Sequence, residues 1–238
     1  MRAINLKTNH LTAPLGMDAG PLFLSWQCVD GVCQTAYEIE LTANGETVWH
    51  SGKVQSAAVH ADAPTVGGSR VRGCWRVRLW DENDTPGAWS EAHFETGLAQ
   101  SDWQGEWVDP ETEEIDIPGD DAINAFARPN WERKQAEKEA AGKGATEPYK
   151  PHRPASYLRK TFTAPKGAAR LYITAKGLYA VWLNGVRVGD MVLAPGSFTG
   201  NKHIAAQTYD VTRYLRDSEN ELLVALGDGW HRSTGGVD

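Results

Sequence analysis

The side chains that could bind a ligand fall in two short segments of the second half of the chain. Asn184 and Asp190 supply amide and carboxylate oxygens near one turn, and Trp182 offers an aromatic face on which a sugar ring could stack. Asp228 and Trp230 repeat this combination closer to the C-terminal end. These residue types suit a carbohydrate-binding site, and the five residues together form the predicted site.

Each of these residues also has a purely structural interpretation. Asn184 precedes a glycine, and Asn-Gly between apolar residues is the strongest short-range signal for a two-residue β-hairpin turn. Asp190 could cap the end of a strand, and Asp228 stands between two glycines, as a turn residue would. Trp182 and Trp230 could simply cover a β-sandwich. Both interpretations stay open from the sequence.

No motif in the sequence predicts a catalytic residue. Asp81, Glu82 and Asp84 place carboxylates close together, as acid–base catalysis requires. They lie in a turn cluster with Pro86 and Gly87, which favours a solvated loop. The early glycines lack the strand–helix context of a dinucleotide site, and the cysteines and histidines lack the spacing of a zinc site.

Composition excludes several classes of protein. The 238 residues carry a net charge of −7 with scattered basic residues, so we expect no nucleic-acid partner. No apolar run reaches the roughly 18 residues needed to span a membrane, so no membrane partner is expected. Three cysteines and a polar N-terminus without a signal sequence predict a cytoplasmic protein.

Strands are predicted over Cys74–Trp80, where apolar and polar residues alternate, over Tyr157–Phe162, and near Ala57–His60. Asn44-Gly45 predicts a second Asn-Gly turn.

The pattern of alternating residues and turns predicts an all-β protein with two domains. Residues 1–100 are expected to form a fibronectin type III-like β-sandwich. Residues 103–238 are expected to form a jelly roll that is incomplete at the C-terminus, because about six strands are predicted where a jelly roll needs about eight. Residues of about 110–155 form a predicted insertion, with a helix over 131–141 that begins after Asn130 as N-cap.

These segments, in this order, are similar to the N-terminal region of a bacterial α-L-rhamnosidase. The resemblance rests on Leu24-Ser25-Trp26, Trp75–Asp81 and Trp89-Ser90 in the first domain, and on Leu158–Phe162, Leu183-Asn184-Gly185 and Gly227–Trp230 in the second. It covers nearly the whole chain apart from the insertion. The first domain then resembles the family's first sandwich, and the second resembles its N-terminal jelly-roll domain.

The resemblance implies a non-catalytic region of a glycoside hydrolase. In this family a separate (α/α)₆ barrel, C-terminal to these domains, releases terminal L-rhamnose by an inverting mechanism that uses two carboxylates. The implied partners are that barrel and rhamnose-containing glycosides or polysaccharides, and the chain alone is expected to be inactive.

The resemblance also implies a role for the jelly roll, which binds rhamnose with help from Ca²⁺ in some family members. Asp190 is the candidate Ca²⁺ ligand, although Met191 follows it where a second oxygen ligand would be expected. The alternative is a purely structural module that positions the barrel or mediates domain contacts or a homodimer.

Overall fold

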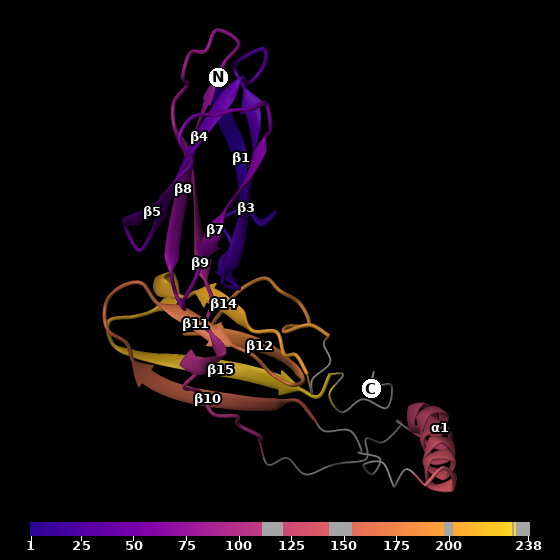
Figure 1. Cartoon of the computed structure of the whole chain (residues 1–238). Coiled ribbons are helices and arrows are strands. Elements are labelled where there is room, and N and C mark those ends of the chain that lie inside the picture. Colours follow the sequence, from indigo (N-terminus) through magenta and orange to yellow (C-terminus); the bar gives the residue numbers. More distant parts are fainter. Residues whose placement is uncertain (111–120, 143–153, 198–201, 230, 232–238) are drawn as a thin grey trace. The chain divides into compact units, whose positions relative to one another are not determined.

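The computed structural model describes residues 1–110, 121–142, 154–197, 202–229 and 231, and their regular structure is mostly β-strand. The chain divides into two compact units, Met1–Gly105 and Glu106–Asp238 (Figure 1). Both units are built from sheets whose strands pair antiparallel, apart from one parallel pair in the first unit, and the all-β fold class is confirmed. Each unit is described by itself below.

The first unit is a sandwich of two sheets. The smaller sheet has the strand order β1-β3-β7, and the larger has the order β2-β9-β8-β4-β5, with β6 paired to β4. The strands are β1 (Arg2–Thr8), β2 (Leu15–Met17), β3 (Gly20–Val29), β4 (Ala36–Ala43), β5 (Glu46–His50), β6 (Val54–Gln55), β7 (His60–Val66), β8 (Arg72–Trp80) and β9 (Ser90–Thr96).

The core of the first unit is centred on two tryptophans that each have a hydrogen-bond partner. Trp75 is fully buried, and its Nε1–H donates to Thr8 Oγ1 at 2.9 Å. Trp26 Nε1–H donates to Gln34 Oε1 at 3.0 Å, and the buried Gln34 amide donates in turn to the backbone oxygens of Ser56 and Ala58. These bonds offset the cost of burying polar atoms in an apolar core.

Two strands of the first unit differ from the sequence prediction. Strand β1 was not expected, because a bulge between Ile4 and Lys7, with Asn5 at a φ of 50°, interrupts the alternation of buried and exposed residues. The strand expected near residues 57–60 instead begins at His60 and continues to Val66. Pairing with β3 determines where β7 begins and ends, and this pairing cannot be read from the residues of β7 alone.

The second unit contains a four-stranded sheet, β10-β15-β12-β13, and a two-stranded sheet, β11-β14, within the described residues. Figure 1 shows β10, β15 and β12 as neighbours. The strands are β10 (Ser156–Thr163), β11 (Arg170–Ile173), β12 (Leu178–Leu183), β13 (Val186–Arg187), β14 (Gln207–Asp210) and β15 (Glu219–Gly227). Val181 and Leu183 of β12 lie in the core with Tyr179, Val188 and Val211.

The two predicted Asn-Gly turns are confirmed. Asn184 and Gly185 have φ values of 53° and 81°, and they join β12 to β13 as a two-residue loop. Asn44 and Gly45 join β4 to β5 in the same way, with φ values of 51° and 88°. Asparagine and glycine tolerate this left-handed conformation, which a two-residue hairpin loop requires at both positions.

The helix α1 spans Asp121–Ala140, so the predicted start after Asn130 is wrong. The helix begins nine residues before Asn130 because residues 121–128 include several strong helix formers, and Pro129 lies inside the helix without ending it. Gly142, with a φ of 66°, follows the helix end. The rest of the predicted insertion, residues 111–120 and 143–153, lies outside the described residues. No described helix is long and apolar enough to cross a membrane.

Asp210 at the end of β14 gives the second unit a pH dependence. A hydrogen bond from the Thr212 side chain, the Thr212 N–H at 3.0 Å and the Arg170 guanidinium hold the pKa of this carboxyl below its ordinary value, although desolvation opposes them. The ionised Asp210 side chain therefore stabilises the folded state fully above the unfolded-state pKa of about 3.9. This stabilisation is lost as the pH falls through the lower pKa of the folded state. In urea unfolding at pH about 5 and about 3, we expect Asp210→Asn to lose less stability on acidification than the unchanged chain. Equal losses would contradict this assignment.

Candidate functional site

The structure does not bring the five predicted site residues together. Asn184 follows the C-terminal end of β12, and Asp228 lies beside its N-terminal end, because Leu178 pairs with Gly227. Six residues of strand separate these two ends, which corresponds to roughly 20 Å. Trp182 lies at the Asn184 end, and Trp230 lies outside the described residues.

The Asn184 amide is engaged in holding the hairpin. Its Nδ2 donates to the Tyr214 carbonyl at 2.7 Å and to Asn220 Oδ1 at 2.8 Å, and its Oδ1 accepts from the Glu221 N–H at 2.9 Å. Both amide hydrogens therefore bond to protein atoms. The turn interpretation of Asn184 is supported by this geometry, which ties the β12–β13 hairpin to β15.

Asn220 is the centre of this network, which we call the asparagine lock (Asn184 and Asn220). The Asn220 side chain is fully buried on β15. Its Nδ2 donates to the carbonyls of Arg216 and Ser218, and its Oδ1 accepts from the Arg216 N–H at 2.8 Å. The lock closes the turn before β15 and fixes the floor of a nearby cleft.

A polar cleft of about 360 Å³ opens next to the asparagine lock. This volume is at the lower end of the range usual for small-molecule sites. Side chains that can donate or accept hydrogen bonds dominate its lining. The residues are Arg159, Thr161, Asn184, Gly185, Arg216, Glu219, Asn220 and Glu221.

An ion pair of Arg159 and Glu221 forms one wall of the cleft. Arg159 Nε lies 2.6 Å and Nη2 2.5 Å from Glu221 Oε2. Arg159 on β10 is opposite Leu223 of β15, which is opposite Trp182 of β12, so the three side chains share the outer face of the sheet. Trp182 and Arg159 thus lie on the same face two strand spacings apart, which is about 10 Å, and Trp182 is not among the residues that line the cleft.

The described residues do not assemble a calcium site around Asp190. Asp190 is exposed, and the Asn184 oxygen already accepts a backbone N–H. No group of three or more His, Cys, Asp or Glu side chains that could hold a metal occurs in the described part of the chain. Ca²⁺ takes six to eight oxygen ligands, so Asp190 alone could not form the site. The Asp228 carbonyl accepts the His231 N–H at 3.1 Å, as in a turn.

Two tryptophans of the first unit, the half-buried Trp89 and the buried Trp80, contact cations of the same unit. Arg76 and Arg78 lie 4.6 and 4.8 Å from the centre of the Trp89 ring, and Lys53 and Arg78 lie 4.8 and 5.0 Å from that of Trp80. Cation–π contacts of this kind stabilise the sheet and occupy the rings.

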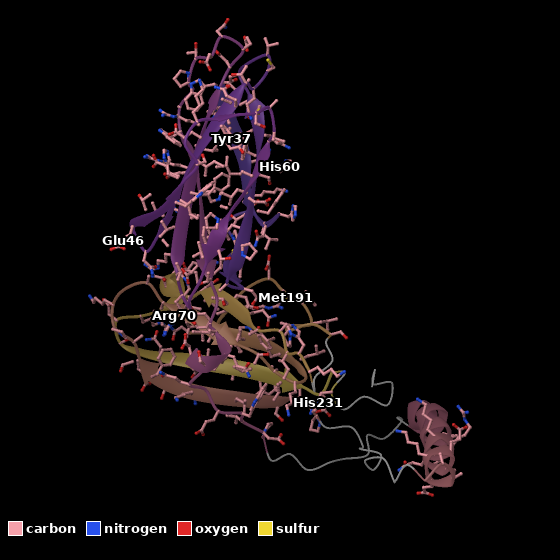
Figure 2. The ribbon with its side chains drawn as sticks, viewed as in Figure 1. Tyr37, Glu46, His60, Arg70, Met191 and His231 are labelled. Carbon is pink, nitrogen blue, oxygen red and sulfur yellow. The ribbon has the colours of Figure 1, made fainter. Side chains whose placement is uncertain are left out.

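The sequence interpretation did not identify Arg159, Thr161 or Glu221 as site residues. Alternation along β10 could place Arg159 and Thr161 on a common face, but only the register with β15 brings Arg159 to Glu221, 62 residues away. Figure 2 shows the described side chains of both units as sticks.

Comparison with known proteins identifies the family of both units. Residues 3–100 match the "Rha78A-like, N-terminal immunoglobulin domain". Residues 165–238 match the "Alpha-L-rhamnosidase N-terminal domain". The first match corresponds to the sandwich of the first unit, and the second to the strands that carry the cleft, apart from β10.

Curated relatives and solved structures agree with these matches. Alpha-L-rhamnosidases of Formosa agariphila and Alteromonas sp. are 34% and 31% identical over 94% and 92% of this chain. The alpha-L-rhamnosidase structure from Dictyoglumus thermophilum has a TM-score of 0.76 at 28% identity over 100% of this chain, and that from Aspergillus terreus has 0.70 at 26% over 96%. The chain covers 24% and 22% of the two relatives and 26% and 24% of the two solved chains, so it spans about a quarter of their length. The chain therefore belongs to the α-L-rhamnosidase family and corresponds to its N-terminal domains.

Proposed function

We propose that this chain is the non-catalytic N-terminal region of an α-L-rhamnosidase that works in the cytoplasm. The catalytic barrel of that protein would release terminal L-rhamnose from glycosides or polysaccharides with inversion. The observation that carries this proposal is the match of both units to rhamnosidase N-terminal domains while the chain spans only about a quarter of its relatives.

Within this region, we propose that the polar cleft beside the asparagine lock binds a sugar. A hydroxyl-rich ligand needs planar groups that donate and accept in pairs, and Arg159 and Glu221 supply both. Thr161 adds a hydroxyl group, and Trp182 lies on the same outer face. These features support a site for a single sugar unit rather than for a long chain.

The second candidate is a scaffold without a sugar site. It is favoured by the asparagine lock, because the predicted binding residue Asn184 uses its amide to hold two segments of the second unit together. A cleft of this size would then be a by-product of the hairpin. The two candidates differ in whether a sugar stabilises the folded chain.

Thermal unfolding with and without L-rhamnose distinguishes these candidates. A ligand that binds only the folded state raises its stability by about 2.7 kcal/mol at one hundred times its dissociation constant. We expect a rise in the melting temperature with L-rhamnose that exceeds the rise with D-glucose at the same concentration. D-glucose is the control because sugars also stabilise proteins by being excluded from their surface.

Two variants locate the site. Arg159→Met keeps the aliphatic stem and removes the guanidinium, so it should abolish the rhamnose-specific rise. Asp190→Ala, on the exposed loop outside the cleft, should leave the rise intact. Loss of the rise in Asp190→Ala alone would move the site to that loop, and the absence of any rhamnose-specific rise would favour the scaffold.

A further inference from the structure

The two Asn-Gly turns of this chain have nearly the same backbone but differ in how their asparagine side chains are held. Asn44 and Gly45 have φ values of 51° and 88°, and Asn184 and Gly185 have φ values of 53° and 81°. Asn44 is exposed, whereas Asn184 is half-buried. The sequence contains no other Asn-Gly pair, so each turn serves as a control for the other.

The side chain of Asn44 is held by one hydrogen bond. Its Oδ1 accepts the Arg72 N–H at 3.0 Å in an exposed bond. Among the described residues, no group accepts a hydrogen of its Nδ2, and none accepts the Gly45 N–H. The Asn184 amide, in contrast, uses its oxygen and both hydrogens in the asparagine lock. Asn44 therefore combines a free amide nitrogen with an open backbone N–H on the next residue.

The hairpin that carries Asn44 lies at the edge of its sheet. Strand β5 is the last strand of the larger sheet of the first unit, and its residues Glu46, Thr47 and Val48 are exposed. Figure 2 labels Glu46, which directly follows the turn. An edge hairpin with few buried contacts opens locally at a low cost in free energy. Such openings let the Asn44 side chain approach the nitrogen of Gly45, which no side chain shields.

We propose that Asn44 is a site of spontaneous deamidation in the folded chain and that Asn184 is protected from the same reaction. The Gly45 backbone nitrogen gives up its proton to solvent and attacks Asn44 Cγ. The bond from Cγ to Nδ2 breaks, ammonia leaves, and a succinimide ring forms. Water then opens the ring at either of its carbonyl carbons, which gives an aspartate or an isoaspartate.

The two products have different effects on the hairpin. Aspartate keeps an oxygen in the place of Asn44 Oδ1, so the bond from the Arg72 N–H is retained. Isoaspartate routes the main chain through the side-chain carbon and adds a methylene group between Ala43 and Gly45. The longer link does not fit the two-residue loop that the pairing of Ala43 with Glu46 closes. We therefore expect isoaspartate at residue 44 to release β5 from the sheet edge.

Peptide-resolved mass spectrometry of the chain measures both sites in one sample. The chain is kept in a mildly alkaline buffer, which favours the deprotonated backbone amide, and the replacement of NH2 by OH is followed at each asparagine. We expect Asn44 to deamidate at least about tenfold faster than Asn184, which corresponds to about 1.4 kcal/mol in activation free energy. The reason is that three hydrogen bonds hold the Asn184 amide and one holds that of Asn44.

The same chain unfolded in guanidinium chloride is the control. Without the fold, each asparagine is simply followed by a glycine, so the two rates should become similar. Equal rates in the folded chain would overturn the proposal. A difference that persists unchanged in guanidinium chloride would overturn it as well, because the fold would then not be the cause.

Asn44→Asp is the matched reference for the products of the reaction. Freshly prepared, this variant carries the aspartate product without isoaspartate. In hydrogen exchange, the amides of β5 should lose protection in the aged chain and keep it in the variant. Equal protection of β5 in the aged chain and in Asn44→Asp would contradict the proposed effect of isoaspartate on the hairpin.

Discussion

Asn220→Ala is expected to lower the free energy of unfolding of the second unit by about 3 kcal/mol. The alanine would leave the Arg216 N–H, two backbone carbonyls and one hydrogen of the Asn184 amide, all in part-buried bonds, without their partner. Unpaired buried polar groups cost about 1–3 kcal/mol each, and partial access of water reduces the sum. Urea unfolding, with hydrogen exchange of β12 and β15 to assign the transition to the second unit, measures the effect.

Two further asparagine variants control for this result. Asn83→Ala changes an exposed asparagine in the loop after β8 and should cost less than about 0.5 kcal/mol. Asn220→Asp keeps the shape but places a buried carboxylate oxygen against the carbonyls of Arg216 and Ser218, so at neutral pH a loss at least as large as that of Asn220→Ala is expected. Equal stability of Asn220→Ala and Asn83→Ala would mean that the asparagine lock contributes nothing.

Trp75→Ala is expected to destabilise the first unit by about 3–5 kcal/mol. Trp75 is the largest fully buried side chain of the core, and its removal would leave a cavity beside Trp26, whose ring centre lies 6.5 Å away. The Thr8 hydroxyl would also lose the Nε1–H that it accepts. Urea unfolding measures this loss of stability, and hydrogen exchange at β3 and β8 assigns it to the first unit.

The exposed Trp107 supplies a matched control for Trp75. The residue is 62% exposed, and its ring centre lies 5.5 Å from Lys176 Nζ. Trp107→Ala therefore removes one exposed cation–π contact, which is worth about 0.5–1 kcal/mol. A loss in Trp75→Ala no larger than that in Trp107→Ala would contradict the placement of Trp75 at the centre of the core.

Local signals in the sequence were sufficient for much of the fold. Alternation predicted strands over Cys74–Trp80 and Tyr157–Phe162, and Asn-Gly pairs predicted both two-residue hairpin turns. Strand β1 escaped prediction because its bulge hides the alternation, and the start of α1 was misplaced because Pro129 is tolerated inside it. Both errors arise where the structure accepts a local irregularity that sequence patterns treat as a boundary.

The candidate site was less predictable than the fold. Asn184 stood out by its residue type, but its amide bonds to segments that begin 30 residues away, at Tyr214, and these bonds give it a structural role. Arg159 and Glu221 carry no motif, and only the pairing of β10 with β15 joins them. The sequence therefore indicated which domain to search, while the register of the sheet determines which side chains meet.

Release of L-rhamnose tests the central claim of this account most directly. An aryl α-L-rhamnoside would be incubated with this chain alone and with the full-length protein, and the anomer of the released sugar followed by NMR. We expect no release by the chain alone and release of β-L-rhamnose by the full-length protein, as an inverting reaction requires. Release by the chain alone, or none by the full-length protein, would contradict the claim that this is the non-catalytic region of an α-L-rhamnosidase.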